Sequence, residues 1–311
     1  MKRLAPTLML ATLGLAWPGV SGACCPTDTS ATTDTSATTP ATDNTAAGPP
    51  QPAAAAAPVA PVADARDDAV FDPAQPDFTL ISLQTTLRLP EHKSAFRVTH
   101  RFSRPLDQGS FGDLANDLFA LDSAAQIGLE FRYGILPGLQ GGMQRTSDRD
   151  IQFFAQYNVL SRSKHLPIDV AVIGTIDGAN NFRDDKSPGI GAIVSSSFSK
   201  YGSVYVEPVW VNNTNPLPLG PADSNNTVFI GTGGRVRVIK DLYVVGEVIP
   251  RVGGYRPGVN NVGFGIEKHV GGHMFQINFQ KGLGTTMAQI ARGGPESDSW
   301  FIGFNITRKF F

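Results

Sequence analysis

The sequence is poor in charge, in cysteine and in long apolar runs, and each shortage excludes a class of protein. Charged residues make up 17% of the 311 residues, below the roughly 25% of ordinary soluble domains. Lysine and arginine number 26 against 27 acidic residues, which is no basic excess for binding phosphates, so no nucleic-acid partner is expected. The two cysteines are adjacent, Cys24 and Cys25, and form no disulfide framework. After the N-terminus no apolar run approaches the roughly 20 residues of a spanning helix.

The N-terminus has the features of an export signal. Lys2 and Arg3 precede an apolar stretch over residues 4–20, and small residues at 21–23 form a cleavage site, so residues 1–23 are a predicted signal peptide. Cleavage after residue 23 leaves Cys24 first, where a bacterial lipoprotein carries its lipid. That pattern prefers an aliphatic residue where Ser21 stands, so a lipidated Cys24 and a plain export cut both stay open.

Residues 24–68 form a Thr/Ala/Pro-rich segment that is expected to be a disordered linker. The hexapeptide at 27–32 is repeated at 33–38, and the segment contains no aromatic residue. Such a composition buries too little apolar surface to offset its ordering entropy. Residues 69–94 are then expected as a periplasmic lead-in to a domain that spans 95–311.

From about Phe78 onward, apolar and polar residues alternate, which predicts strands with two unlike faces. From Ile127 to Ile135 every odd position is apolar, and Glu130 and Arg132 stand between them. The segments are about as long as a tilted membrane strand, roughly 9–11 residues. About twelve strands are expected, over residues 95–103, 126–135, 139–147, 150–160, 166–176, 188–199, 203–213, 226–239, 242–251, 261–270, 273–282 and 299–310.

The connections between these strands alternate between tight and mostly longer, as periplasmic turns and outer loops do in outer-membrane barrels. Because hydrocarbon offers no water to unpaired strand edges, the sheet is expected to close. The predicted fold is an all-β, antiparallel, up-and-down transmembrane β-barrel in the bacterial outer membrane, and the alternative is a periplasmic β-sandwich. Pro208 and Pro250 fall within strand segments, where proline is tolerated only at strand ends, edges or bulges, so Pro208 weakens the assignment of the seventh strand. The terminal Phe311 resembles the signal by which the barrel-assembly machinery recognises a last strand, so that machinery and outer-membrane lipid are the expected partners.

Side chains opposite the apolar face are expected to line the lumen. This register selects twelve candidates: Arg97, Arg101, Glu130, Arg132, Asp169, Glu207, Arg235, Arg237, Glu247, Glu267, Gln276 and Asn278. Their two signs of charge are nearly balanced, whereas an ion-selective pore is expected to show an excess of one sign. The set therefore indicates either a salt-bridged interior or a narrow passage or binding site for a zwitterionic or neutral solute.

Other motifs are weak. Leu114, Leu118 and Leu121 have helical spacing with Asp113 able to cap, and this short helix could fold into the barrel mouth or lie across its rim. His269 and His273 flank two glycines, which indicates a hairpin turn, whereas metal-binding His pairs of this spacing need one helical face. With no nucleophile elbow in the sequence, no catalytic residue, metal or cofactor is expected, and the protein is expected not to be an enzyme.

The chain from about Phe78 to Phe311 resembles an uncharacterised family of bacterial outer-membrane β-barrels, a domain of unknown function. The resemblance is carried by Gln84-Thr85-Thr86-Leu87, Phe96-Arg97-Val98-Thr99-His100-Arg101-Phe102, Phe119-Ala120-Leu121-Asp122, Ile127-Gly128-Leu129-Glu130, Tyr133-Gly134, Gly271-Gly272-His273-Met274-Phe275-Gln276 and Gly303-Phe304-Asn305-Ile306-Thr307-Arg308. The resemblance implies the β-barrel fold and a location in the outer membrane, and it implies no activity. Members typically lack the long linker and the cysteine pair, so it does not imply lipidation.

Two functions are compatible with these patterns. The first is a porin-like channel or binding barrel that transports a small polar solute through a charge-balanced lumen. The alternative is a closed structural or assembly barrel whose periplasmic tether engages an envelope partner. The first hypothesis needs an accessible lumen, and the second needs a filled one.

Overall fold

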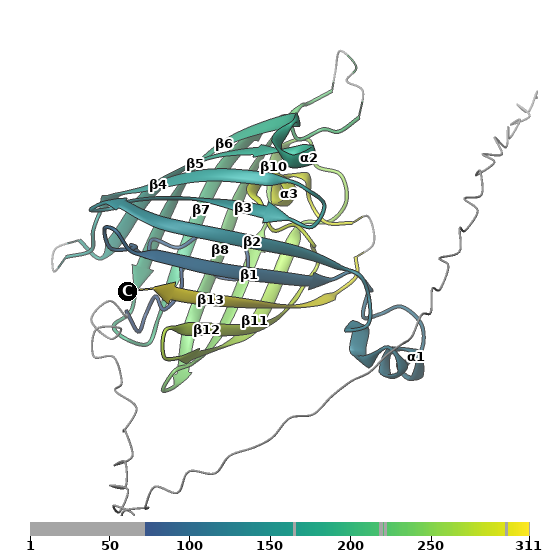
Figure 1. Cartoon of the computed structure of the whole chain (residues 1–311), viewed down its shortest axis with the longest axis horizontal. Helices are drawn as coiled ribbons and strands as arrows, with labels where there is room; N and C mark the ends of the chain where they lie inside the picture. The colour runs from purple at the N-terminus through teal and green to yellow at the C-terminus, as the bar shows by residue number, and fades with distance from the viewer. Residues whose placement is uncertain (1–71, 164–165, 218–219, 221–222, 296–297, 311) are drawn as a thin grey trace, which may run out of the picture. The chain divides into compact units, whose positions relative to one another are not determined.

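The computed structural model describes residues 72–163, 166–217, 220, 223–295 and 298–310. The predicted signal peptide (1–23), the linker (24–68) with Cys24, and Phe311 lie outside the described residues. Within the unit Ala60–Phe311 the described strands form a single antiparallel sheet (Figure 1). The predicted all-β fold is thereby confirmed.

Thirteen strands are present in the described residues. Their bounds are β1 Ser94–Phe102, β2 Ala125–Leu136, β3 Leu139–Thr146, β4 Ile151–Leu160, β5 Ile168–Gly178, β6 Asp184–Ser197, β7 Gly202–Asn212, β8 Asn226–Ile239, β9 Leu242–Ile249, β10 Arg251–Gly254, β11 Asn261–Val270, β12 His273–Gln280 and β13 Phe301–Phe310. β9 and β10 both pair with β8 and are separated only by Pro250, so they are two parts of one barrel strand. The prediction of about twelve strands is correct, and the largest difference at a strand start is β6, which begins four residues before the expected 188.

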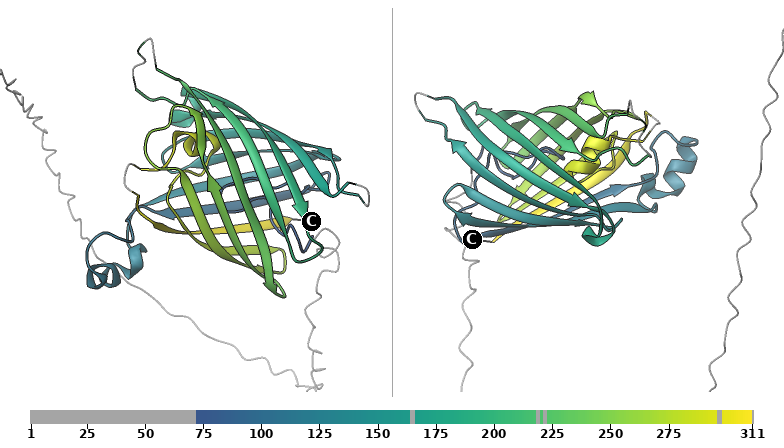
Figure 2. Two further views of the ribbon diagram at one scale, coloured as in Figure 1. Left: turned by 180° about the vertical axis from the view of Figure 1, so that it is seen from behind. Right: turned by 90° about the horizontal axis from the view of Figure 1, so that it is seen from above.

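The sheet closes between its first and last strands. β1 pairs with β2 on one side and with β13 on the other, from Ser94 opposite Phe310 to Arg101 opposite Gly303. Each described strand except the short β10 has a neighbour on both sides. Figure 2 shows the resulting barrel from behind and from above. Closure gives the strand N–H and C=O groups partners that a hydrocarbon environment cannot supply.

Alternation along each strand separates an apolar outer face from a polar inner face. On β2, Phe131 is 46% exposed while the neighbouring Glu130 and Arg132 are 4% and 1% exposed. The outer face carries aromatic and branched residues on nearly every strand, such as Phe153, Val206 and Ile277. This is the pattern of a barrel surrounded by acyl chains, because a water-soluble protein would bury these side chains.

The two ends of the barrel differ. At the end that we call the short-turn end, the connections are 137–138, 161–167, 198–201, 240–241 and 271–272, and β1 begins and β13 ends there. At the long-loop end the connections include 103–124, 213–225 and 281–300. The helical segments belong to the long-loop end: α1 Phe111–Asn116, η2 Leu118–Ala120, α2 Ala179–Phe182 and α3 Met287–Arg292. In the described part of the chain, every helix is too short or too polar to cross a membrane.

Pro208 lies inside β7 without ending it. On one side it is paired with Ile230 of β8, while on the other side the β6–β7 ladder passes from the pair Gly191–Val209 to the pair Val194–Val206. Proline lacks an N–H for the ladder, and this gap is where the missing donor is accommodated.

We expect a charge on the outer face to weaken the membrane-inserted barrel according to its depth. Val206→Arg, on the exposed face of β7, should lower the free energy of unfolding in lipid vesicles by about 2–4 kcal/mol. Tyr201→Arg, in the turn before β7, should cost about 0–1 kcal/mol, because arginine is tolerated near the interface. Urea titration of the refolded barrel measures both, and equal losses in the two variants would contradict the placement of the outer face in lipid.

Candidate functional site

The side chains predicted to line the lumen do lie on the inner face, and most are inaccessible to solvent. Ten are at most 5% exposed: Arg97, Arg101, Glu130, Arg132, Glu207, Arg235, Glu247, Glu267, Gln276 and Asn278. Asp169 and Arg237 are half-buried at the short-turn end. There Asp169 accepts a hydrogen bond from the backbone N–H of Arg162, and Arg237 lies 3.9 Å from Asp241. The burial of the ten follows from what fills the barrel.

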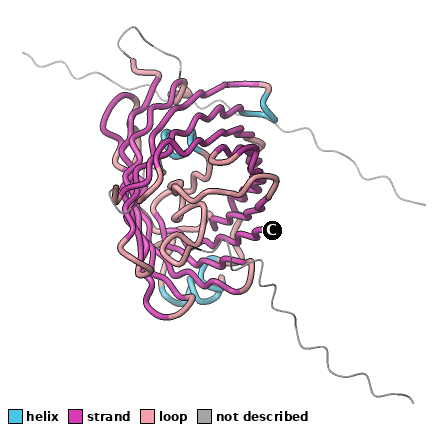
Figure 3. The backbone as a smooth tube through the Cα atoms, turned by 90° about the vertical axis from the view of Figure 1, so that its left-hand side faces the viewer, coloured by secondary structure: helices cyan, strands magenta, loops and turns pink. Residues whose placement is uncertain are grey.

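Residues 74–89 run through the interior as a hairpin, which we call the lumen hairpin. Its residues are buried except Ser82, which is half-buried, and Arg88, which is exposed. The sequence predicts a periplasmic lead-in over 69–94, and the structure corrects this for residues 74–89, which lie inside the barrel. Figure 3 shows loop segments within the ring of strands.

The lumen hairpin enters and leaves at the short-turn end. Asp72 lies 3.5 Å from Arg162 in the β4–β5 connection, and His92 donates its backbone N–H to Gly134 near the end of β2. The two arms are joined by a bridge between Thr79 and Gln84 and by the backbone hydrogen bond from Leu80 to Leu83. The tip therefore lies at residues 81–83, deep in the lumen.

A single carboxylate binds the tip. The backbone N–H groups of Ile81, Ser82 and Leu83 all donate to Glu247 of β9, at 2.9–3.1 Å. Glu207 of β7 accepts from the N–H of Gln84 at 3.0 Å. Charge-assisted bonds of this kind are stronger than neutral ones, and they satisfy donors that have no ladder partner.

Cations and amides on the inner face bind the carbonyl groups of the hairpin. The carbonyl oxygen of Ile81 accepts three hydrogen bonds, from Arg97, Arg101 and Asn305, at 2.6, 3.3 and 3.1 Å. Further inner-face donors to hairpin carbonyls are Arg235 to Thr79, Gln276 to Leu80, Gln156 to Thr85, Asn158 to Thr86, Gln140 to Leu87, Lys309 to Pro76 and the Ser203 hydroxyl to Ala74. Side chains of the inner face therefore bind the hairpin backbone along both of its arms.

Several charged side chains of the inner face form ion pairs with one another. Arg235 and Glu267 form a fully buried ion pair, and Glu130 lies 2.9 Å from Arg132 and 4.0 Å from Arg97. The Arg132 guanidinium also lies 5.1 Å from the centre of the Phe78 ring, a cation–π contact with the hairpin. Pairing of this kind offsets part of the cost of removing charges from water.

The long-loop end is filled by α3. Met287, Ala288, Ile290 and Ala291 are buried, and they form one apolar cluster with the hairpin tip and with inner-face side chains of β5 to β9. The helix is begun by Thr286, whose side chain accepts from the N–H of Gln289 in a capping box. This helix is not among the elements predicted from the sequence.

Polar contacts tie α3 to the neighbouring loops. The Gln289 amide donates to Asp148 and to Asp150, both at 3.0 Å, and the Met287 N–H donates to Gln152. Partial burial, together with the nearby Asp148 carboxylate, raises the pKa of Asp150 above its ordinary value. The hairpin and α3 thus occupy the interior from opposite ends.

The loop that the sequence suggested for the barrel mouth is elsewhere. α1 begins after Ser110, which is its N-cap, and Asp113 accepts from the N–H and hydroxyl of Ser110 instead of capping the helix itself. These bonds lower the pKa of Asp113. α1 has no buried residue and projects beyond the barrel (Figure 1), so the prediction that this segment could fold into the mouth is wrong.

The histidine pair lies at a turn, as the two glycines predict. β11 and β12 are joined through Gly271 and Gly272, where Gly271 has a positive φ of 55°. Among the described residues no group of three or more His, Cys, Asp or Glu side chains is placed to hold a metal ion.

The contact of Glu247 with the hairpin tip makes a stability prediction. Glu247→Ala leaves the N–H donors of Ile81, Ser82 and Leu83 without their acceptor, so the free energy of unfolding should fall by at least about 3 kcal/mol, at about 1–3 kcal/mol for each unsatisfied group. Glu247→Gln keeps one acceptor oxygen and should lose less. As a control, the exposed Glu91→Ala should stay within about 0.5 kcal/mol of the parent, and a Glu247→Ala midpoint in urea equal to that control would contradict the contact.

A second stability prediction concerns the ion pair between Arg235 and Glu267. Arg235→Met leaves Glu267 as a buried unpaired carboxylate and should cost about 3–5 kcal/mol. Adding Glu267→Leu removes that charge and should restore part of the loss, since apolar replacement of a whole buried pair is often neutral. The four corners of this double-mutant cycle are measured by urea unfolding, and additive losses would show that the pair is not coupled.

Comparison with known proteins agrees with this architecture. The family model described as "Membrane bound beta barrel domain (DUF5777)" matches residues 77–310. No curated protein matches the chain. The NanC porin aligns with a TM-score of 0.47 and 10% identity over 70% of this chain and 99% of its own.

Variants of the Rhodopseudomonas blastica porin align with a TM-score of 0.31 and 15% identity over 60% of this chain and 55% of theirs. The matched region thus spans little more than half of that porin, and at these TM-scores neither likeness supports a conclusion about function. The family match includes almost all of the lumen hairpin and every barrel strand. The chain belongs to the DUF5777 family of membrane-bound β-barrel domains.

Proposed function

We propose that this protein is a closed barrel of the bacterial outer membrane that anchors its own N-terminal extension at the periplasmic face and does not conduct solute in its resting state. The observation that carries the proposal is the lumen hairpin, whose backbone is bound by inner-face side chains around the barrel. No enzymatic role is part of the proposal.

The energetics of opening favour a closed state. Withdrawing the hairpin would expose Leu80, Ile81 and Leu83, which are at most 2% exposed, and burial of each such side chain is worth roughly 1.5–3 kcal/mol. It would also separate the Glu247 carboxylate from three N–H donors and leave the facing arginines without their carbonyl acceptors. In an open pore, hydration would have to offset both the lost apolar burial and the lost hydrogen bonds.

The path of the hairpin supports the anchoring role. Both arms reach the short-turn end, where Asp72, the first described residue, lies 3.5 Å from Arg162. Short turns face the periplasm in outer-membrane barrels, which is also where an exported chain with a predicted signal peptide arrives. The Thr/Ala/Pro-rich linker is then available to an envelope partner on that side.

Conductance measurements test the closed lumen. The full chain reconstituted in planar bilayers should give no steady conductance steps, whereas a variant that lacks both residues 74–89 and α3 (Met287–Arg292) should produce them, because the hairpin and α3 together fill the lumen. Steady steps from the full chain would overturn the proposal.

Cysteine labelling gives a readout that does not depend on the deletion variant folding. In a Cys24→Ser, Cys25→Ser background, Thr85→Cys places a thiol at a position that is 0% exposed on the hairpin. It should resist a water-soluble maleimide, while Ser147→Cys in an exposed loop should react fully. Equal labelling of the two would show that the hairpin leaves the lumen.

The anchoring role has a separate test. Deletion of residues 26–68 should abolish cross-linking to envelope proteins while leaving the heat resistance of the folded barrel unchanged. An unchanged set of cross-linked proteins would remove the support for a tether.

A gated passage is the second candidate, favoured by polar atoms within the filled lumen. In the described part of the chain, Arg101 Nε, Glu207 Oε1 and Asn278 Oδ1 are buried without a hydrogen-bond partner. Such groups are commonly bound by water, and water beside the hairpin would lower the cost of its withdrawal. Under this candidate, conductance steps appear in Glu247→Ala but not in the parent.

A further inference from the structure

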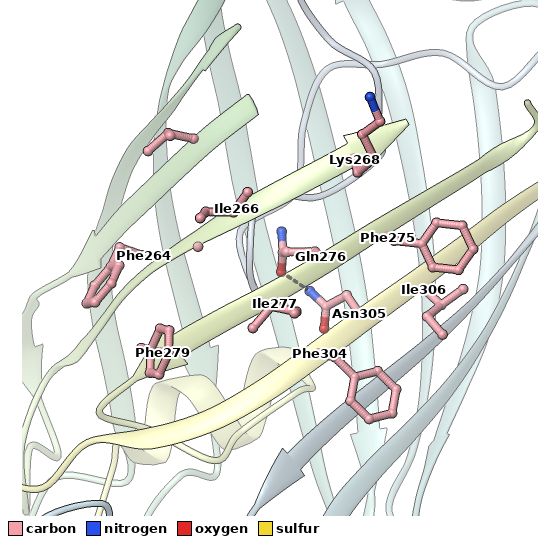
Figure 4. Close-up of a pocket in the computed structure, with 12 residues that line it drawn as sticks. Phe264, Ile266, Lys268, Phe275, Gln276, Ile277, Phe279, Phe304, Asn305 and Ile306 are labelled. Carbon is pink, nitrogen blue, oxygen red and sulfur yellow. Dashed lines mark hydrogen bonds between the residues drawn. The ribbon is translucent and has the colours of Figure 1, made fainter. Parts of the chain in front are cut away.

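The outer face of the barrel has a hollow that the lumen does not explain. It lies over β9, β11, β12 and β13 and has a volume of about 670 Å³, within the roughly 300–1,000 Å³ of small-molecule sites. In Figure 4 Ile266 and Ile277 lie between Phe264 and Phe279 on one side and Phe275 and Phe304 on the other. The hollow is therefore a groove walled by aromatic rings with an aliphatic floor.

The two ends of this groove differ in chemistry. Toward the long-loop end, Phe264 stacks on Phe279 with ring centres 5.3 Å apart and meets Trp300 edge-on at 5.4 Å. Toward the short-turn end, Lys268 lies on the rim, exposed and two residues before the end of β11. Within the described residues Lys268 takes part in no ion pair. Among the described residues that line the groove, Lys268 is the one with a charged side chain.

A second cation lies at the same end. Arg308 projects from β13 on the outer face, and its guanidinium lies 3.2 Å from the ring of His273 on β12. Phe275 forms part of the groove wall and is paired with Lys268 on β11 and with Ile306 on β13. Arg308 therefore lies two strands away from Lys268 and two residues closer to the short-turn end. The polar end of the groove is thus cationic.

We propose that this groove holds one anionic phospholipid of the periplasmic leaflet, with an acyl chain between the aromatic walls and the phosphate at Lys268, assisted by Arg308. An apolar groove on a barrel in water would be a partner site, but on a membrane-bound barrel the surrounding apolar molecules are acyl chains. The cations select the anionic headgroup, because basic residues at the bilayer surface attract anionic lipids. The short-turn position of both cations selects the leaflet.

The lengths agree with this occupant. Four residues separate Lys268 from Phe264 along β11, which is about 13 Å at roughly 3.3 Å per residue. The middle of an acyl chain whose headgroup is at Lys268 would then lie beside Phe264 and Trp300. The choice of leaflet rests on the orientation given in the proposed function, but neither the groove nor its cations depend on the closed lumen.

Fluorescence quenching by brominated lipid tests the proposal on the full chain. The sequence has three tryptophans, and Trp17→Phe with Trp210→Phe leaves Trp300 as the reporter. The protein is refolded into phosphatidylethanolamine vesicles that contain a minor, equal mole fraction of mid-chain-brominated phosphatidylglycerol or mid-chain-brominated phosphatidylethanolamine. We expect the brominated anionic lipid to be enriched at Trp300 about fivefold over the zwitterionic one, as one lysine at a lipid surface provides.

Two variants and a matched control locate the site. Lys268→Gln should abolish the preference for the anionic lipid, whereas Lys200→Gln, an exposed lysine in the β6–β7 turn at the same end, should keep it. Ile266→Phe, on an exposed position of the groove floor, should reduce quenching by filling the hollow with the charges unchanged.

Three results would overturn the proposal. Equal quenching by the two lipids in the parent would exclude headgroup selection, and a preference that survives Lys268→Gln would exclude this site. Weak quenching by both lipids, together with a cross-linked dimer, would show that a second copy of the chain covers the groove instead.

Discussion

The structure depends on one constraint: a backbone N–H or C=O that leaves water must find another partner. On the outside, hydrocarbon imposes this constraint, and the pairing of β1 with β13 satisfies it by closing the sheet. Inside, the same constraint applies to a hairpin that contributes few ladder bonds of its own, and the inner-face side chains satisfy it. The balanced charges of the interior follow from this. A peptide backbone presents donors and acceptors alike, so carboxylates bind its N–H groups and guanidinium and amide groups bind its carbonyls.

The barrel could be predicted from sequence because it obeys a local period. Two-residue alternation fixes which side chains face inward, and so Arg97, Arg235 and Glu247 were placed on the inner face from the pattern alone. What they contact could not be predicted in the same way. Glu247 and the tip at Ile81 are more than 160 residues apart, and no period connects a strand position to a segment that crosses it. The residues before β1 are therefore predicted as a lead-in to the barrel. Phe78, Leu80 and Leu83 are the signal against this prediction, because apolar side chains favour burial.

The two short helices show a related limit. The leucines at 114, 118 and 121 have helical spacing, and so do Met287 and Ile290 with Ala291. Local amphipathicity indicates that a segment has one apolar face, but not which body that face meets. α1 has no buried residue, whereas α3 lies against side chains of β5 to β8 and the hairpin tip. The difference arises from what surrounds each loop: the inner face of β5 to β9 carries apolar residues such as Ile173, Val211 and Phe229, and α3 covers them.

The distribution of polarity inside the barrel separates two tasks. Near the long-loop end the interior is apolar and is sealed by α3, so water is excluded there by packing. At the hairpin tip the side chains join this apolar cluster, while the backbone is bound by charged side chains through hydrogen bonds. Packing is insensitive to small changes of charge, but a hydrogen-bonded network in a low dielectric is stable only while every member keeps its partner. Withdrawal of the hairpin would break these hydrogen bonds and remove Leu80, Ile81 and Leu83 from the apolar cluster, whereas α3 and the strand side chains of that cluster would stay in place, so the barrel would keep its shape while its interior loosened from the short-turn end.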